Sequence, residues 1–166
     1  MNDFTEALLF TEDLLVDYMK RAGLFWSPCT SGNTYRSRVL SKFTKDIGAA
    51  VYNFSLIQEG EVFYTYDIQG HSYPNQNFFP DGYSPLDFLE YCSKLASCAL
   101  SIVIDGNEEF GDSTTLTITK ILASFMRTGE FARAGGWSSL QDMGRRCTSL
   151  HVIQTLKGIS IKARCL

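Results

Sequence analysis

The chain has 166 residues, of which 45% are hydrophobic and 13% aromatic. A chain of this size and composition can bury a substantial apolar core, so we expect one folded domain over residues 1–166. No apolar run approaches the roughly 20 residues that a membrane-spanning helix needs, which excludes a transmembrane protein. The first ten residues contain two acidic and no basic side chains, and their apolar run at 7–10 is too short for a secretion signal.

Cysteine usage indicates a reducing compartment. The five cysteines are an odd number and widely spaced, and none of them forms the C-x-x-C pair of a zinc or redox site. Free thiols are therefore the simplest interpretation, and we expect a cytoplasmic protein.

The net charge of −3 is unevenly distributed. Residues 1–113 contain 16 acidic and 7 basic side chains, a net charge of −9, whereas residues 114–166 contain 2 acidic and 8 basic side chains, a net charge of +6. Such an imbalance is typical of a charged docking surface, or of two halves that attract each other within one fold.

The first part of the chain predicts two helices. Apolar residues recur at helical spacing over 6–22, where Thr5 or Thr11 could cap the start and Gly23 follows as a stop. A second amphipathic stripe predicts a helix over 34–47, which Gly48 would end.

The period of the apolar pattern then changes from that of a helix to that of a strand. Residues 50–57 and 61–68 are dense in Tyr, Phe, Val and Ile, and residues 58–60 between them supply a turn with a glycine. This pattern predicts an antiparallel hairpin.

A third helix has the clearest start in the sequence. Ser84 can cap it, Pro85 suits its first position, and Asp87 suits its third. The remaining expected elements are, in order, a short strand over 101–105, a helix over 114–127 capped by Ser113, a helix from Ser138 or Ser139 to Arg146, and a closing hairpin of 150–156 with 159–163. This irregular alternation predicts a single-domain α+β fold, with helices packed on a small and mostly antiparallel sheet.

The sequence contains no recognisable motif for catalysis or cofactor binding. A phosphate-binding glycine loop, a dinucleotide fingerprint and a nucleophile elbow are all absent. The acidic turn that begins at Asp105 has the initial spacing of a calcium loop, but Phe110 and Leu116 stand where that loop needs a glycine and a bidentate glutamate. We therefore expect no catalytic residues, no bound metal and no cofactor.

An irregular aromatic segment with acidic neighbours is the best candidate for a partner-binding surface. Its aromatic side chains could form the lid of a core or, if exposed, the anchors of an interface. The candidate partner-binding residues are Asp67, His71, Tyr73, Phe78, Phe79, Asp81, Tyr83 and Asp87.

Two other functions stay open as alternatives. A small enzyme could use a dispersed pair such as Cys29 or Cys92 with His71. A nucleic-acid-binding protein could use the basic tail with Trp137 as a stacking surface, although the acidic chain makes direct binding unlikely. The basic residues concerned are Arg145, Arg146, Lys157, Lys162 and Arg164.

The middle of the chain resembles the core of plasmid antirestriction proteins of the ArdB/KlcA type. The resemblance covers about residues 36–100, and it depends on a glycine-preceded aromatic segment at 47–56, Glu59–Gly60, Phe63–Tyr64 and the Ser84–Pro85 helix start. The family's upstream tryptophan-bearing segment and its acidic C-terminus are absent here. The resemblance implies a small non-enzymatic protein of a mobile element that blocks a host restriction system.

Taken with the lack of catalytic motifs and the acidic first two thirds, these features predict a non-enzymatic, protein-binding inhibitor of the bacterial cytosol. It would be an immunity protein that neutralises a toxin or nuclease, or an antirestriction or other anti-defence factor. Its expected partner is another protein, such as a basic nuclease, a toxin or a restriction enzyme, because acidic inhibitors suit basic targets.

Overall fold

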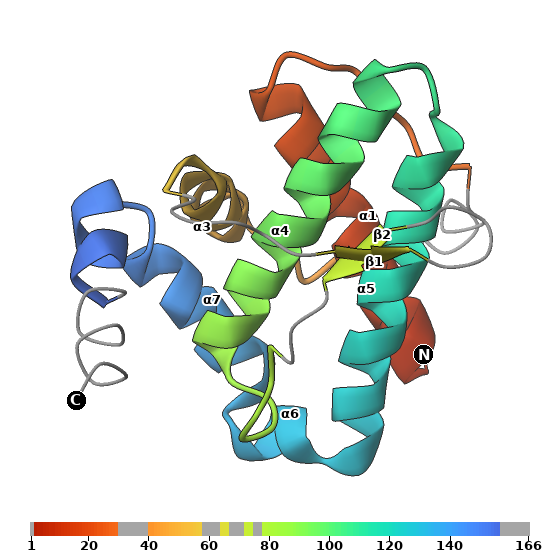
Figure 1. Ribbon diagram of the computed structural model, residues 1–166. Helices are drawn as coiled ribbons and strands as arrows, with labels where there is room; N and C mark the ends of the chain where they lie inside the picture. Colours follow the sequence, from red (N-terminus) through yellow and green to blue (C-terminus); the bar gives the residue numbers. More distant parts are fainter. Residues whose placement is uncertain (1, 30–39, 58–63, 67–71, 75–77, 157–166) are drawn as a thin grey trace.

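The computed structural model describes residues 2–29, 40–57, 64–66, 72–74 and 78–156, and for 64–66 and 72–74 it describes the backbone. Most of these residues are helical (Figure 1). The elements in chain order are α1 (Asp3–Arg21), α3 (Lys45–Leu56), β1 (Tyr64–Tyr66), β2 (Ser72–Pro74), α4 (Pro85–Ile104), α5 (Glu109–Thr128), α6 (Glu130–Arg133) and α7 (Gly136–Arg146), and residues 150–156 are also helical. The predicted α+β class is therefore wrong. The strands β1 and β2 have three residues each and form one two-stranded ladder, so the fold of the described residues is built by helix packing.

Residues 50–57, predicted as a strand, form most of α3 and its C-terminal cap. The side chain of Thr44 caps the helix by accepting from the Ile47 N–H at 3.3 Å. The buried apolar side chains of α3 are at 47, 50, 51 and 54, so that each has another three or four residues away. This spacing is that of a helix, and burial of the stripe outweighs the strand preference of the β-branched and aromatic residues.

The predicted helix over 34–47 is displaced from the observed one. Residues 40–44 are not helical, α3 begins at Lys45, and residues 34–39 lie outside the described part of the chain. Gly48 was predicted to end that helix, yet it lies inside α3. A side chain at this position would project into the space that Asp17 of α1 occupies.

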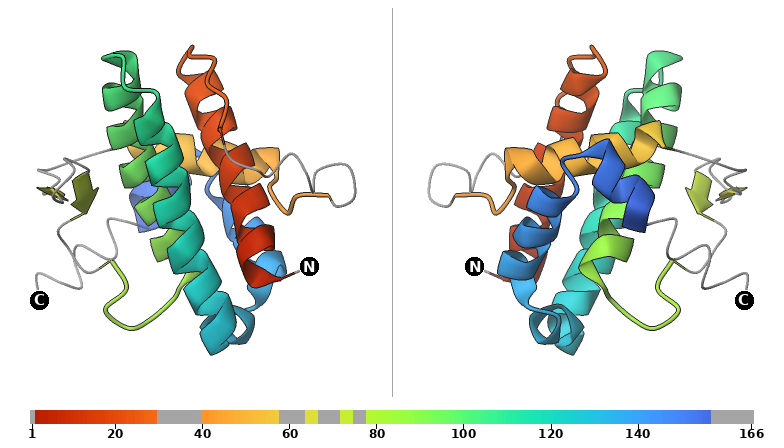
Figure 2. Two further views of the ribbon diagram at one scale, coloured as in Figure 1. Left: turned by 90° about the vertical axis from the view of Figure 1, so that its right-hand side faces the viewer. Right: turned by 90° about the vertical axis from the view of Figure 1, so that its left-hand side faces the viewer.

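The strand predicted over 61–68 is confirmed at the three residues of β1. Its partner differs from the prediction, because β1 pairs with β2 in an antiparallel register that sets Tyr64 opposite Pro74. The predicted turn at 58–60 lies outside the described residues. The ladder packs beside α4, at the edge of the helical body (Figure 2).

The first predicted helix is confirmed as α1, and it begins three residues earlier than expected. Its cap is Asn2, whose side chain accepts from the Thr5 N–H at 2.7 Å, so neither predicted threonine cap is correct. Most of α1 is buried, because the helix packs against α5, α3 and α4. Figures 1 and 2 show α1 and α5 side by side in opposite directions.

The start of α4 is confirmed at the predicted residues. Ser84 accepts from the Asp87 N–H at 3.1 Å, and Pro85 occupies the first turn. The strand predicted over 101–105 is wrong, because α4 continues to Ile104. A turn with Gly106 at a φ of +106° then leads into α5, which begins five residues before the predicted helix at 114.

In Figure 1, α6 lies at the lower end of α5, and α7 leads from there past α4 toward α3. α7 ends at Arg146 as predicted, but it begins at Gly136 rather than at Ser138 or Ser139. Residues 150–156, predicted as one strand of a closing hairpin, are helical, and 159–163 lie outside the described residues. α7 approaches α3 closely at Gly144, where an added Cβ would lie 2.8 Å from the Ile47 side chain.

Aromatic rings join these helices into one core. Phe10 of α1 has no exposed surface, and its ring centroid lies 5.0 Å from that of Trp137 and 6.4 Å from that of Phe88. Trp137 also packs edge-on against Phe131 at 5.0 Å. Among the described helices, none is both long and apolar enough to cross a membrane.

Candidate functional site

In the structure, the predicted aromatic segment packs mainly against the core. Phe78 and Phe79 are half-buried, and their ring centroids lie 5.6 Å and 5.3 Å from that of Tyr91 on α4. Tyr83 is buried, 5.4 Å from Phe125 and 5.3 Å from Phe131. These three rings therefore form a lid on the core, which was one of the two possibilities left open by the sequence.

The other predicted partner-binding residues lie around this lid or outside the described residues. Asp81 is exposed in the turn before α4, and Asp87 is half-buried in the first turn of that helix. Tyr73 pairs with Thr65 in the short ladder. Asp67 and His71 lie outside the described part of the chain.

A different acidic surface lies at the opposite end of α4. The C-terminal end of α4 and the first turn of α5 lie together at the upper end of the molecule in Figure 1, and the segment that follows α1 bonds to the start of α5. Asp105, Glu108 and Glu109 are exposed there and Asp112 is half-buried. We call these four residues the acidic end. Within the described residues, no ion pair involves Asp105, Glu108 or Glu109.

The segment over 24–29 is fastened to the acidic end at two points. Trp26 is buried, and its indole N–H donates to the Glu108 carbonyl at 3.2 Å. The indole occupies the space beside Gly111, where an added Cβ would lie 2.5 Å from the ring. Further along, the Cys29 backbone N–H donates to the Asp112 carboxylate at 2.8 Å.

Along the chain, Phe25 lies between the end of α1 and the bonded residues Trp26 and Cys29, and 90% of its surface is exposed. Phe25 was not singled out from the sequence, and the segment from Asp105 was identified only as an acidic turn. The bond from Trp26 to Glu108 spans 82 residues of sequence, so no local pattern could show that the two segments meet.

The acidic end changes the chemistry of the exposed thiol beside it. The negative charge of Asp112 raises the pKa of Cys29, followed by the hydrogen bond of the thiol to the same carboxylate, and then by slight burial and the charges of Glu108 and Glu109. The thiolate is the reactive form of cysteine. Cys29 is therefore exposed but held in its less reactive form.

Replacing Asp112 by Asn should make Cys29 more reactive. The amide keeps an acceptor for the Cys29 N–H but removes the negative charge, so the pKa of Cys29 falls and more thiolate forms at a given pH. We expect faster alkylation by iodoacetamide at pH 8, and a pH–rate profile displaced to lower pH. Peptide mapping by mass spectrometry measures the rate at Cys29 alone, and Asp3→Asn serves as a distant control. An unchanged profile would show that Asp112 does not control the thiol.

The residues of the alternative functions occupy unfavourable positions. Cys92 is fully buried in α4, and burial raises its pKa well above the usual range. Neither Cys29 nor Cys92 therefore has the lowered pKa of an activated nucleophile. Trp137, the proposed stacking surface for nucleic acid, is half-buried between Phe10 and Phe131, and its indole N–H bonds to Glu6.

Two of the basic residues proposed for nucleic-acid binding lie in the described part of the chain. Arg145 and Arg146 are exposed at the end of α7, and Arg145 pairs with Asp142 of the same helix. Lys157, Lys162 and Arg164 lie outside the described part. Within the described residues, no group of three metal-ligating side chains is placed to hold an ion.

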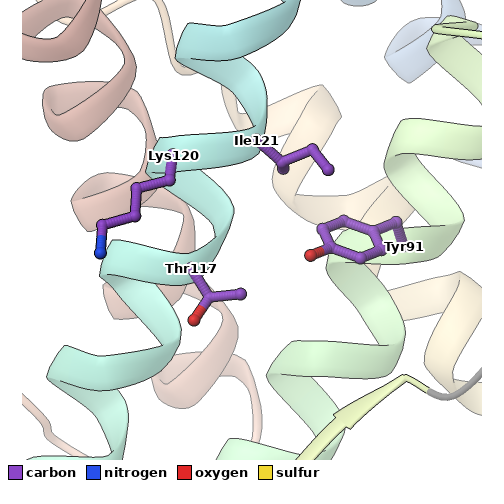
Figure 3. A pocket seen from close by; sticks show the side chains of 4 residues that line it. All are labelled: Tyr91, Thr117, Lys120 and Ile121. Atoms are coloured by element: carbon purple, nitrogen blue, oxygen red, sulfur yellow. The ribbon is translucent and has the colours of Figure 1, made fainter.

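An open pocket of about 420 Å³ lies between α4 and α5. Tyr91 lines it from α4, and Thr117, Lys120 and Ile121 line it from α5 (Figure 3). The figure shows the Lys120 side chain extending away from the Tyr91 ring. The polar groups therefore do not converge on one point, as they do in specific small-molecule sites.

No family model, curated protein or solved structure matches this chain. The resemblance to antirestriction proteins of the ArdB/KlcA type therefore stays a prediction from the sequence.

Proposed function

We propose that this protein is a non-enzymatic inhibitor of the bacterial cytosol that binds a basic target protein through its acidic end. The observation that carries the proposal is the set of exposed carboxylates at Asp105, Glu108 and Glu109, which have no ion-pair partner among the described residues. A toxin, a nuclease or a restriction enzyme fits the required chemistry, because nucleic-acid-handling proteins carry basic surfaces.

Electrostatic attraction supports this kind of function in two ways. A concentrated negative surface steers a basic partner toward it, and steered association reaches about 10⁸–10⁹ M⁻¹s⁻¹ at low salt, against about 10⁵–10⁶ M⁻¹s⁻¹ without steering. The same surface repels acidic proteins and nucleic acids. Fast capture and selectivity of this kind suit an inhibitor that must reach its target before the target acts.

The acidic end is preferred to the predicted surface around Asp81 for a structural reason. The two lie at opposite ends of α4, so they cannot act as one small interface. The aromatic rings next to Asp81 are packed into the core, whereas Asp105, Glu108 and Glu109 of the acidic end are exposed.

The test is affinity capture of the tagged protein from a bacterial lysate, with washes at increasing salt and mass spectrometry of what remains. We expect one basic protein in stoichiometric amount, released progressively as salt screens the carboxylates. Adding the purified chain to that protein should then inhibit its activity. Recovery of no basic protein, or of nucleic acid alone, would contradict the proposal.

A further inference from the structure

We propose that the lid formed by residues 78–83 opens as a unit and exposes the thiol of Cys92. The lid lies at the end of α4 opposite the acidic end, so this inference does not depend on the proposed function. Three observations carry it: a buried hydroxyl of Tyr83 without a hydrogen bond, a glycine of positive φ at position 82, and the burial of Cys92 beneath the lid.

The hydroxyl of Tyr83 is buried without a protein partner. Tyr83 exposes 8% of its surface, and its hydroxyl oxygen makes no hydrogen bond within the described residues. A buried tyrosine hydroxyl usually finds a partner, because an unsatisfied one costs free energy that hydration in water would avoid. The closed lid therefore carries a cost that opening removes, and this brings the open state closer to the closed one in free energy.

Gly82 gives the lid a backbone conformation that side chains disfavour. Its φ is +86°, and an added Cβ would meet the carboxylate of Glu130 at the start of α6. Its N–H donates to the Phe79 carbonyl at 3.1 Å, which closes a turn within the lid. The backbone of the lid is a loop that extends outward from the lower end of α4 (Figure 2). It can therefore move without disturbing a helix.

The thiol of Cys92 lies beneath the lid. Cys92 has no exposed surface, and it follows Phe88 by one helical turn. The ring of Phe88 lies 6.0 Å from that of Tyr83, and the neighbouring Tyr91 packs against the other two lid rings. Burial and then the nearby Cys92 thiol raise the pKa of Tyr83, so the two side chains lie close together. A thiol reagent thus reaches Cys92 only when the lid or the whole fold opens.

Opening of the lid breaks fewer contacts than unfolding of the helices. It separates the lid rings from four other rings and leaves the hydrogen bonds within α4 and α5 intact. These four rings are Phe88, Tyr91, Phe125 and Phe131. Local openings of this kind need less free energy than global unfolding, and because they expose little surface they depend only weakly on denaturant.

The first experiment measures how fast iodoacetamide alkylates Cys92 in the folded chain at pH 8, by peptide mapping, at urea concentrations below the unfolding transition. We expect the rate to rise only slightly with urea, since lid opening exposes little surface. Tyr83→Phe keeps the ring and removes the unpaired hydroxyl, so the rate should fall at least about fivefold. A rate that follows the globally unfolded fraction, or an unchanged or higher rate in Tyr83→Phe, would overturn the proposal.

Gly82→Ala is expected to act in the opposite direction. Its methyl group meets Glu130 and disfavours the positive φ, so the closed lid is destabilised and alkylation of Cys92 should accelerate about fivefold or more. Gly23→Ala is the matched control, because Gly23 has a φ of +88° in open space beyond the end of α1. The control should leave the rate unchanged. Equal acceleration in both variants, or none in Gly82→Ala, would contradict opening at the lid.

Discussion

Replacing Phe10 by Ala is expected to lower the free energy of unfolding by about 3–5 kcal/mol, the cost of removing a fully buried aromatic side chain. Phe10 has no exposed surface, and its ring lies close to Trp137 of α7 and Phe88 of α4. The substitution therefore leaves a cavity where three helices meet. For a domain of this size the melting temperature should fall by about 10 °C.

Urea unfolding followed by circular dichroism measures this effect. Phe25→Ala is the control, because it truncates the same type of side chain at a position that is 90% exposed, and it should change stability by less than about 0.5 kcal/mol. Equal stabilities for the two variants would contradict the helical core described here.

The start of α4 shows which parts of the fold the sequence could predict. Ser84 and Pro85 act within one turn, through a side-chain bond to the Asp87 N–H and a fixed backbone angle. Such signals do not depend on the rest of the fold. The caps of α1 and α5 were missed because Asn2 precedes the apolar pattern and Glu108 makes no side-chain cap bond.

The residues at 50–57 show where local reasoning failed. Their β-branched and aromatic composition favours a strand, but Val51 and Phe54 continue a buried stripe that begins at Ile47. The stripe is recognisable only when 45–56 is considered as one element, and the predicted stop at Gly48 divided it. Close packing against Asp17, and not chain termination, is the reason for a glycine at that position.

The candidate site depended on contacts that the sequence does not reveal. Aromatic density around Tyr83 was visible, but whether those rings face the core or the solvent is decided by Phe125 and Phe131, which lie more than 40 positions away in the sequence. The acidic turn at 105–109 was also visible. Its contact with Trp26 was not, because that contact depends on the fit of the indole over Gly111.

Reversing two charges at the acidic end should nearly abolish binding of the target. In Glu108→Lys/Glu109→Lys, two carboxylates that would face cations become two ammonium groups, and like charges across an interface cost several kcal/mol. We expect the dissociation constant to rise at least about 100-fold, which corresponds to about 2.7 kcal/mol. The fold should persist, because both residues are exposed and their favourable interaction with the helix dipole of α5 contributes only about 1 kcal/mol to the free energy of unfolding.

The affinity of the captured target for three forms of the chain tests the central claim most directly. The forms are the wild type, Glu108→Lys/Glu109→Lys, and Asp3→Lys/Asp81→Lys, which changes the net charge equally at exposed sites away from the acidic end. Calorimetric titration at 50 and 200 mM salt should give weak or undetectable binding for the first variant only, with salt-sensitive binding for the other two forms. Equal loss of affinity in both variants would indicate a general charge effect, and full affinity in Glu108→Lys/Glu109→Lys would show that the target binds elsewhere.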